Sequence, residues 1–417
     1  MEALTAEPSV VDALVHAYDL AVTTGPESLT PVGASRFKAL ARTGGDRPIV
    51  GFGAGATEQA ARVRAVLECV ERLAQFAARE PPGVVACRLD ELPDAVAPAE
   101  LGLYSSHQYA ALSGRVTAFS EEMVLDWLPM RDLRTGRERF VPVETVHPRA
   151  PLRHLPLVLE TSSGTAAHLH YGDALLAGLC EVVERDAVLV FWHRQPRTPQ
   201  LSVELLPDPV REEMRHVQAA GHVVIVADLT YLEVPCFLVL ALRRTALGYG
   251  LGCHPDPAAA LAHAVRELGA RLGWMAESAH GALAHLPVGA VVSGSDHYGL
   301  YHNGPLHGVL RDVLSSALRP PNRPASSPAG QPAPAPKPVR PGWPAVAATL
   351  AESGFPVLAR DITPARARDC GAVVVRVVVP GLVPFHVGGG TLRLGCARLT
   401  GTTAPGQLRN LLPHFLS

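Results

Sequence analysis

The segment Thr161–Trp192, TSSGTAAHLHYGDALLAGLCEVVERDAVLVFW, decides how we expect the chain to fold. A Ser- and Gly-rich start is followed by an apolar run typical of a helix, and this run carries Asp173, Glu181 and Glu184. With about 3.6 residues per turn, the three carboxylates fall near one helix face, with Arg185 one position further round. Buried carboxylates are unfavourable unless a cation or a donor pairs with them. The segment alone therefore indicates either a metal site or a solvated salt-bridge lattice.

A second segment, Arg64–Phe76, repeats part of this pattern with the sequence RAVLECVERLAQF. In both segments a Glu is followed by one residue and then by Val-Glu-Arg. The matching residues are Glu68, Glu71 and Arg72 in the first copy and Glu181, Glu184 and Arg185 in the second. Two helices that present paired carboxylates to one cavity would form an oxygen-rich site for Mg²⁺, which usually accompanies nucleotide phosphates. A P-loop is excluded, because the sequence has no GxxxxGK[ST] motif.

Taken in order, these and four further segments resemble the YcaO superfamily of ATP-dependent enzymes that activate peptide backbone amides. The segments are Gly51–Phe76 (GFGAGATEQAARVRAVLECVERLAQF), Asp126–Val146 (DWLPMRDLRTGRERFVPVETV), Thr161–Trp192, Ala227–Leu272 (including DLTYLEVPCFLVLAL and GLGCHPDPAAALAHAVRELGARL), Asp296–Tyr301 (DHYGLY) and Asp361–Pro384 (DITPARARDCGAVVVRVVVPGLVP). Within the superfamily, the chain is most similar to the cyclodehydratase branch (D-proteins), which makes azoline rings in thiazole/oxazole-modified ribosomal peptides.

The resemblance implies a mixed α/β (α+β) fold whose sheets are covered by helices, with ATP and Mg²⁺ held between carboxylate-bearing helices. It implies that residues 46–417 form the YcaO domain and that residues 1–45 are an N-terminal segment of the same domain. Residues 319–342, RPPNRPASSPAGQPAPAPKPVRPG, contain too much Pro, Ala and Ser to bury a core. We expect them to form a disordered or polyproline-like loop that interrupts the domain.

The resemblance also implies roles for individual residues. The metal ligands would be Glu68, Glu71, Asp173, Glu181 and Glu184. The nucleotide contacts would be Arg64, Arg72, Ser162, Ser163, Arg185 and Arg271. Azoline-forming members tend to end in a proline-rich tail that positions catalytic groups. In the C-terminal LLPHFLS, Pro413 and His414 are the residues that match this tail.

The chain departs from the family pattern at several of these positions. Arg64 stands where the family usually has a small hydroxyl residue, and Ser163 stands where it has Asn. Ala270 replaces a glutamine that the family often carries. Arg64 would either contact a phosphate bidentately or fill the pocket and pair with Glu68. The second outcome would make the chain a degenerate subunit.

Local patterns predict the elements around these motifs. Gly51–Gly55 and Tyr249–His254 are predicted to be Gly-containing turns, and a helix is expected from about Thr57. The Ala-rich segment Pro257–Met275 is predicted to be helical, with Glu267 and Arg271 forming an ordinary ion pair unless Arg271 binds phosphate. Further helices and strands are expected at 10–21, 139–143, 208–220, 223–227, 235–242, 343–353, 356–361 and 373–379. Arg376 lies inside the last of these apolar runs and needs a partner there.

Composition limits the class of protein. With 37 basic and 39 acidic residues and a formal net charge of −2, the chain has no basic field for nucleic acid. Hydrophobic residues make up 47% and charged residues 18%, which is typical of a soluble globular protein. The N-terminus lacks a signal peptide, and the apolar run Val223–Leu242 is broken by charges and a proline, so no membrane span is expected. Seven cysteines without a CxxC pair indicate reduced thiols in the cytoplasm.

The function implied is an ATP- and Mg²⁺-dependent cyclodehydratase that acts on a ribosomal precursor peptide. No leader-binding winged-helix domain is visible, so a separate partner that captures the leader peptide is implied. Homodimers are frequent in the family, and composition neither supports nor opposes one here. Two alternatives stay open: an ATP-dependent thioamidation enzyme that uses external sulfide, and a degenerate, non-catalytic scaffold subunit.

Overall fold

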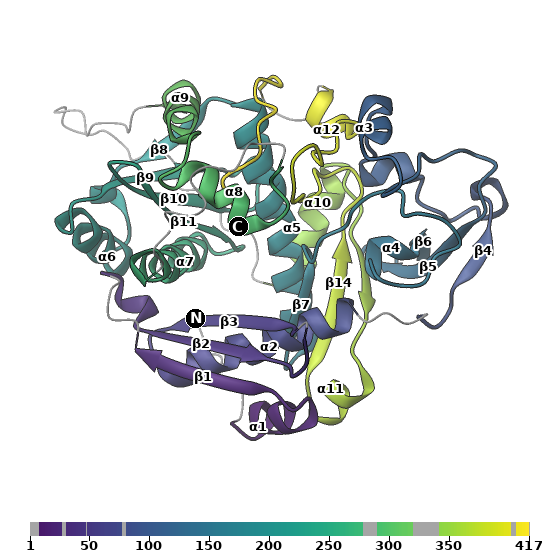
Figure 1. The fold of residues 1–417 in the computed structure, drawn as a ribbon, viewed down its shortest axis with the longest axis horizontal. Helices are drawn as coiled ribbons and strands as arrows, with labels where there is room; N and C mark the ends of the chain where they lie inside the picture. Colours follow the sequence, from purple (N-terminus) through teal and green to yellow (C-terminus); the bar gives the residue numbers. More distant parts are fainter. Residues whose placement is uncertain are drawn as a thin grey trace.

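The computed structural model of the chain describes residues 8–26, 31–46, 48–76, 81–277, 290–319, 342–401 and 406–416. These residues form three β-sheets with helices packed on them, so the expected mixed α/β (α+β) class is confirmed (Figure 1). Residues 320–341, which make up nearly all of the loop predicted at 319–342, lie outside the described residues. No helix among those described is long and apolar enough to cross a membrane.

The N-terminal sheet is antiparallel and has three strands in sequence order. They are β1 (Ala21–Pro26), β2 (Phe37–Arg42) and β3 (Val50–Gly55). Helix α2 (Glu58–Gln75) packs on this sheet, and α1 (Pro8–Ala17) packs against α2. The Thr57 hydroxyl caps α2 by accepting the Ala60 N–H, as expected from the sequence. Residues 21–42 therefore share one sheet with the Gly51–Gly55 segment.

The second sheet has the strand order β11-β10-β9-β8-β12. Its strands are β8 (Thr198–Leu201), β9 (Val223–Asp228), β10 (Cys236–Arg243), β11 (Ala246–Cys253) and β12 (Leu318–Arg319). The helices that accompany it are α6 (Asp208–Ala219), α7 (Pro257–Glu277), α8 (Gly294–Tyr301) and α9 (His307–Ala317). The predicted helices at 208–220 and 257–275 and the strands at 223–227 and 235–242 are confirmed within one or two residues.

The third sheet has the order β4-β5-β13-β14-β7, with β6 paired to β5. Its strands are β4 (Val85–Cys87), β5 (Leu125–Asp132), β6 (Glu138–Pro142), β7 (Thr165–His168), β13 (Leu358–Asp361) and β14 (Val373–Val378). The remaining helices are α3 (Ser106–Ala111), α4 (Val143–Val146), α5 (Tyr171–Arg194), α10 (Trp343–Glu352), α11 (Ala365–Asp369) and α12 (Ala397–Thr400). Short 3₁₀ turns lie at Gly33–Ser35 (η1), Leu89–Glu91 (η2), Pro98–Leu101 (η3) and Val203–Leu205 (η4).

The two predicted glycine turns are wrong, because both segments are strands. Residues 51–55 lie in β3 and residues 249–253 lie in β11. The glycines are needed for close packing instead: a Cβ on Gly53 would lie 2.0 Å from the Ala61 carbonyl oxygen of α2. A Cβ on Gly252 would likewise lie 2.0 Å from the Ala260 carbonyl oxygen of α7. Each helix thus lies with its backbone directly on a strand backbone.

These two contacts belong to one strand–helix unit that occurs twice in the chain. Each unit is a strand that contains the sequence Gly-x-Gly, followed by a helix. The two helices carry Ala residues and the sequence Val-x-Glu at the same distances from the glycines. The corresponding residues are Gly51, Gly53, Ala61, Ala65, Glu68 and Arg72 in the first unit and Gly250, Gly252, Ala260, Ala264, Glu267 and Arg271 in the second. This duplication was not predicted from the sequence.

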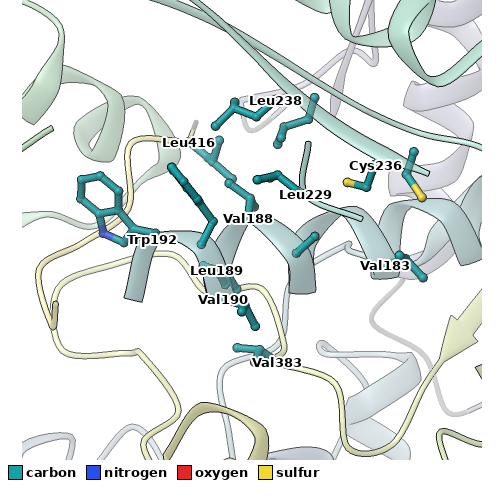
Figure 2. Packing of buried hydrophobic residues seen from close by; sticks show 14 of the residues in the cluster. Val183, Val188, Leu189, Val190, Trp192, Leu229, Cys236, Leu238, Val383 and Leu416 are labelled. Atoms are coloured by element: carbon teal, nitrogen blue, oxygen red, sulfur yellow. The ribbon is translucent and has the colours of Figure 1, made fainter. Parts of the chain in front are cut away.

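The main core surrounds α5, which is buried through most of its second half. Figure 2 shows Val188 and Leu189 of α5 near Leu229 and Leu416. Residues from β10, α8, α10 and the C-terminal segment share this hydrophobic cluster. Helix α5 is therefore the element against which distant parts of the chain pack, as its apolar sequence indicated.

We expect Gly53→Ala to destabilise the fold by about 3 kcal/mol or more, since its methyl group would overlap two backbone atoms of α2. Gly25→Ala, in β1 of the same sheet, is the matched control because a Cβ there meets nothing within 4 Å. Its effect should stay within about 0.5 kcal/mol. Urea unfolding of both variants measures the difference, and equal stabilities would contradict the close-packing explanation.

Candidate active site

Three sheets end at strands that line one region of the molecule. β3, β11 and β7 are the terminal strands of their sheets, and α2, α7 and α5 pack beside them (Figure 1). The outer side of a terminal strand has backbone N–H groups without a strand partner. Here, glutamates from the three helices accept these N–H groups.

Five glutamates make such contacts. Glu68 Oε2 accepts from Phe52 N at 2.6 Å, Glu181 Oε2 from Gly164 N at 3.0 Å, and Glu267 Oε2 from Leu251 N at 3.2 Å. Glu71 accepts from Ala167 N of β7 and Glu184 from Cys253 N of β11. The five carboxylates therefore hold three sheet edges and three helices together.

Each of the three helices also carries an arginine four residues after a glutamate. Arg72 Nη2 lies 2.6 Å from Glu68 Oε1, and Arg185 Nη2 lies 3.7 Å from Glu181 Oε1. In α7, Arg271 follows Glu267 at the same spacing. Each of the three helices thus brings both carboxylate and guanidinium groups to the site.

The carboxylates are close enough to repel one another. Burial raises the pKa of Glu71 well above its ordinary value, and the charges of Glu181 and Glu68 add to the effect. Burial and the charge of Glu267 raise the pKa of Glu184 to about 8, while Arg185 opposes them. Burial likewise raises the pKa of Glu68. A cation placed among these groups would be strongly stabilised in its bound state.

Glu267 differs from its neighbours. Although burial opposes ionisation, the hydrogen bond from His263 and the charges of His263 and Arg185 lower its pKa to about 2. The His263 Nε2 atom lies 3.5 Å from Glu267 Oε1. Glu267 is therefore held as a carboxylate in the middle of the cluster.

The donor set fits Mg²⁺ bound together with a polyphosphate. Among the described residues, no group of three or more Asp, Glu, His or Cys side chains is arranged to coordinate one metal ion. Mg²⁺ normally takes only one or two carboxylates and completes its shell with water and phosphate oxygens. Each of Glu68 and Glu181 uses one oxygen for a backbone N–H, and its other oxygen faces an arginine.

Aromatic rings fix the direction of two arginines. The Arg185 guanidinium carbon lies 4.7 Å from the ring centroid of Phe385, and that of Arg271 lies 4.2 Å from the ring centroid of Tyr249. Tyr298 also contacts Arg271, at 5.6 Å. Stacked guanidinium groups keep their edge donors available for planar or tetrahedral anions.

The expected metal ligands divide into two groups. Glu68, Glu71, Glu181 and Glu184 meet in the cluster. Asp173 does not, because it lies in the first turn of α5, about 12 Å along the helix axis from Glu181. Its side chain is 54% exposed and lies 3.5 Å from His168 Nδ1.

Arg64 does not pair with Glu68, which was one of its two expected outcomes. Glu68 pairs with Arg72, and Arg64 Nη1 instead donates to the Ala54 carbonyl oxygen at 2.8 Å. Burial and the nearby charge of Arg266 lower the pKa of Arg64 to about 10. Arg64 therefore does not neutralise the glutamates.

The two serines lie in the short segment before β7. The Ser162 carbonyl oxygen accepts from Thr165 N at 2.9 Å, and the Ser163 carbonyl oxygen accepts from Arg376. Both residues are half-buried and adjoin Gly164, whose N–H binds Glu181. The segment thus lies at the edge of the carboxylate cluster.

The C-terminal tail is buried instead of lying on the surface. Side chains of α5 and α8 donate to its carbonyl oxygens: His193 to Asn410 at 2.7 Å, Trp192 to Leu412 at 3.0 Å, Tyr301 to Pro413 at 2.5 Å and His297 to His414 at 3.0 Å. Phe415 and Leu416 are fully buried.

Both ring nitrogens of His414 are used within the fold. Nε2 lies 2.8 Å from the His386 carbonyl oxygen, and Nδ1 accepts the Leu416 N–H. The tail nevertheless reaches the site through two rings: His414 stacks on Phe385 at 4.9 Å, and Phe415 contacts Tyr249 at 5.4 Å. These are the rings that support Arg185 and Arg271.

Glu267 and the supporting rings were not identified from sequence. The Glu267–Arg271 spacing equals that of Glu68–Arg72 and Glu181–Arg185, and this third repetition is the signal that could have revealed it. Phe385 and Tyr249 carry no such signal, because their role depends on tertiary packing.

The model of the family described as YcaO cyclodehydratase, ATP- and Mg²⁺-binding, matches residues 52–383. An uncharacterised protein of Methanothermobacter thermautotrophicus is 30% identical over 252 residues, which cover 58% of this chain and 62% of that protein. An uncharacterised protein in the tfuA 3′ region of Rhizobium leguminosarum bv. trifolii is 28% identical over 158 residues, covering 34% of this chain and 38% of that protein. The chain thus spans less than two thirds of the length of both relatives.

Solved structures share the fold at low sequence identity. A heterocyclase in complex with substrate and cofactor has a TM-score of 0.72 at 20% identity, covering 97% of this chain and 57% of that one. YcaO from Methanopyrus kandleri, bound with AMPPCP and Mg²⁺, has a TM-score of 0.60 at 20% identity and covers 91% of each chain. The E. coli microcin synthetase McbBCD complex with pro-MccB17 bound has a TM-score of 0.56 at 13% identity, covering 86% of this chain and 87% of that one.

Four buried histidines around the tail predict an acid-sensitive fold. Burial lowers the pKa of His193 to about 4 and lowers those of His297, His386 and His414 as well. Unfolding then takes up protons below the ordinary histidine pKa of about 6.5, so stability is full above that pH and falls as pH drops from 6.5 towards 4.

His386→Leu should reduce this loss of stability by about one proton's slope, roughly 1.4 kcal/mol per pH unit. Thermal unfolding between pH 7.5 and 4.5 measures it. The exposed His107 provides the control, because His107→Asn should leave the slope unchanged. An identical slope in both variants would contradict the prediction.

Proposed function

The chain belongs to the YcaO family, and we propose that it is an ATP-dependent cyclodehydratase that converts Cys, Ser or Thr of a ribosomal precursor peptide to azolines. The observation that carries the proposal is the cluster of five glutamates and three arginines at the meeting point of three sheet edges. Such a cluster suits a magnesium-bound polyphosphate, because it supplies carboxylates for the cation and guanidinium groups for the phosphates.

The proposed reaction has two steps. The substrate's own thiol or hydroxyl loses its proton and attacks the preceding backbone carbonyl carbon, which closes a five-membered ring and turns the carbonyl oxygen into an oxyanion. The γ-phosphoryl group of ATP is then transferred to that oxygen, and the C–O bond breaks so that the former amide oxygen leaves in phosphate. As the phosphate leaves, the amide nitrogen loses its proton and forms the C=N bond of the azoline, so the peptide loses one water overall.

The residues of the chain act through charge and position. Glu68, Glu71, Glu181 and Glu184, with Glu267, would hold Mg²⁺, while Asp173 would bind only outside this cluster. Bound Mg²⁺ would neutralise the phosphates and the charge that develops on the transferred group. Arg72, Arg185 and Arg271 would contact the phosphates, with Arg64, Ser162 and Ser163 at the edge of the nucleotide site.

The tail would act as a positioning element. Pro413 and His414 are buried, so His414 would orient Arg185 through Phe385 instead of exchanging a proton with substrate. Phe415 would support Arg271 in the same way through Tyr249. This arrangement keeps both arginines aimed at the phosphates without using a lysine.

We further propose that a separate protein captures the leader peptide and that the chain works in the cytoplasm. We also propose that the chain forms a homodimer, as members of the family often do. The free state of all seven cysteines fits a reducing compartment.

Glu181→Gln is expected to lower peptide-dependent ATP hydrolysis at least 100-fold, because it removes charge from the centre of the cluster. Asp173→Asn is the control on the same helix and should retain activity within a few-fold, since Asp173 lies outside the cluster. Equal losses would contradict the assignment of the site. The assay needs the precursor peptide and the leader-binding partner.

Product mass and isotope labelling test the chemistry. Precursor peptide with an ¹⁸O-labelled backbone carbonyl should lose one water, and the label should appear in inorganic phosphate. A gain in mass from exchange of oxygen for sulfur would instead identify thioamidation. If the chain binds no ATP in any combination with peptide and partner, it is a scaffold subunit.

A further inference from the structure

A small cavity lies beside the carboxylate cluster, between α5 and β14. Its volume is about 60 Å³, and Arg185, Arg376, Arg393, Glu160 and Ser163 are among the residues that line it. A water molecule needs roughly 10–15 Å³ of such space, so the cavity has room for about four water-sized groups. A phosphate ion has four oxygens.

The cavity has an excess of positive charge. Arg376 and Arg393 are 4% and 1% exposed, and they share one carboxylate, that of Glu160. Arg393 Nη2 lies 3.0 Å from Glu160 Oε1, and Arg376 Nη2 lies 3.7 Å from Glu160 Oε2. Two buried cations with one buried anion leave a net positive charge that an anion would offset.

Carbonyl oxygens take most of the remaining donors. Arg376 donates to the carbonyl oxygens of Thr145 and Ser163, and Arg393 donates to those of Leu101 and Leu159. These contacts are neutral, so they fix the two guanidinium groups without cancelling their charge. The arginines are thus rigidly placed before any ligand arrives.

The charges of three arginines meet at this cavity. Arg185, Arg376 and Arg393 all line it, and Glu160 is the carboxylate among the lining residues. The Nε atoms of Arg393 and Arg185 are enclosed by protein and make no hydrogen bond to a described residue, so these two groups contribute charge, not free donors, to the cavity. An anion would balance this charge, whereas a water molecule would not.

The cavity adjoins the candidate active site. Arg185 belongs to both, and Ser163 immediately precedes Gly164, whose N–H binds Glu181. An anion released beside Arg185 would have a second, more deeply buried position next to it. Besides Glu160, the charges of Glu181 and Glu71 also act on Arg376.

We infer that this cavity binds inorganic phosphate, held by Arg393, Arg376 and Arg185. Naming the source of the phosphate as ATP turnover rests on the proposed function, but the binding does not. The cavity receives the phosphate that leaves the peptide, and it keeps this product away from the newly formed ring.

The test is whether the full chain binds inorganic phosphate without nucleotide or metal. Broadening of the ³¹P NMR line of inorganic phosphate measures this binding. Arg393→Lys keeps the charge but removes the guanidinium group that the Leu101 and Leu159 carbonyl oxygens hold at the cavity, and it should weaken binding at least tenfold. Arg398→Lys is the control, since Arg398 is an equally buried arginine that pairs with Asp186 outside the cavity. It should bind phosphate within twofold of the unmodified chain.

Val182→Met provides a second variant that keeps all three arginines and fills the cavity instead. It should also weaken binding at least tenfold, and it decides the matter if Arg393→Lys fails to fold. No phosphate binding by the unmodified chain, or unchanged binding in a folded Val182→Met or Arg393→Lys protein, overturns the inference.

Magnesium–ATP binding by the same proteins separates the two proposals. Phosphate binding without ATP binding would support the cavity and contradict the proposed function. ATP hydrolysis without phosphate binding would contradict the phosphate site and would support the proposed function.

Discussion

The fold depends on the way carboxylates pair with the unpaired N–H groups of three sheet edges. A terminal strand needs some partner for its outward N–H groups, and in this chain the partners for β3, β7 and β11 include glutamates from α2, α5 and α7. The same side chains that join the sheets are therefore the ones available to a cation. A change in one of these carboxylates therefore has two effects. It removes a contact between a helix and a sheet edge, and it alters the charge of the candidate site.

Helix α5 links this joint to the rest of the molecule. Glu181 and Glu184 lie near the middle of this helix, and its second half is surrounded by the main core. Asp186, which follows them, forms a buried pair with Arg398 at 2.7 Å and accepts the Val383 N–H at 2.9 Å. The tail then packs along the last turns of the helix through Trp192 and His193. A displacement of the tail would therefore also move Phe385 and Tyr249, the rings that support Arg185 and Arg271.

Much of this organisation was predictable from sequence because it depends on local periodicity. The helices α2, α5 and α7 and the clustering of Glu68, Glu71, Glu181 and Glu184 follow from repeated spacings. Other features depend on contacts between distant residues. Gly51 and Gly53 looked like turn residues because glycine marks both turns and close backbone contacts. The partner of Arg376 is Glu160, and no sequence pattern connects the two. Asp173 has the right helical phase but lies two turns from the cluster, and phase alone does not report distance along an axis.

The duplicated strand–helix unit gives the molecule two matching backbone supports. Positions outside the strand–helix contact can differ between the two copies without changing how each helix packs on its strand. The copies agree where backbones touch, at Gly53 with Ala61 and at Gly252 with Ala260, and they differ at Arg64 and His263, which occupy equivalent positions. The two copies thus place a guanidinium group and an imidazole ring at equivalent points of the same backbone arrangement. The molecule is symmetric in how these units pack and asymmetric in the chemical groups that they present.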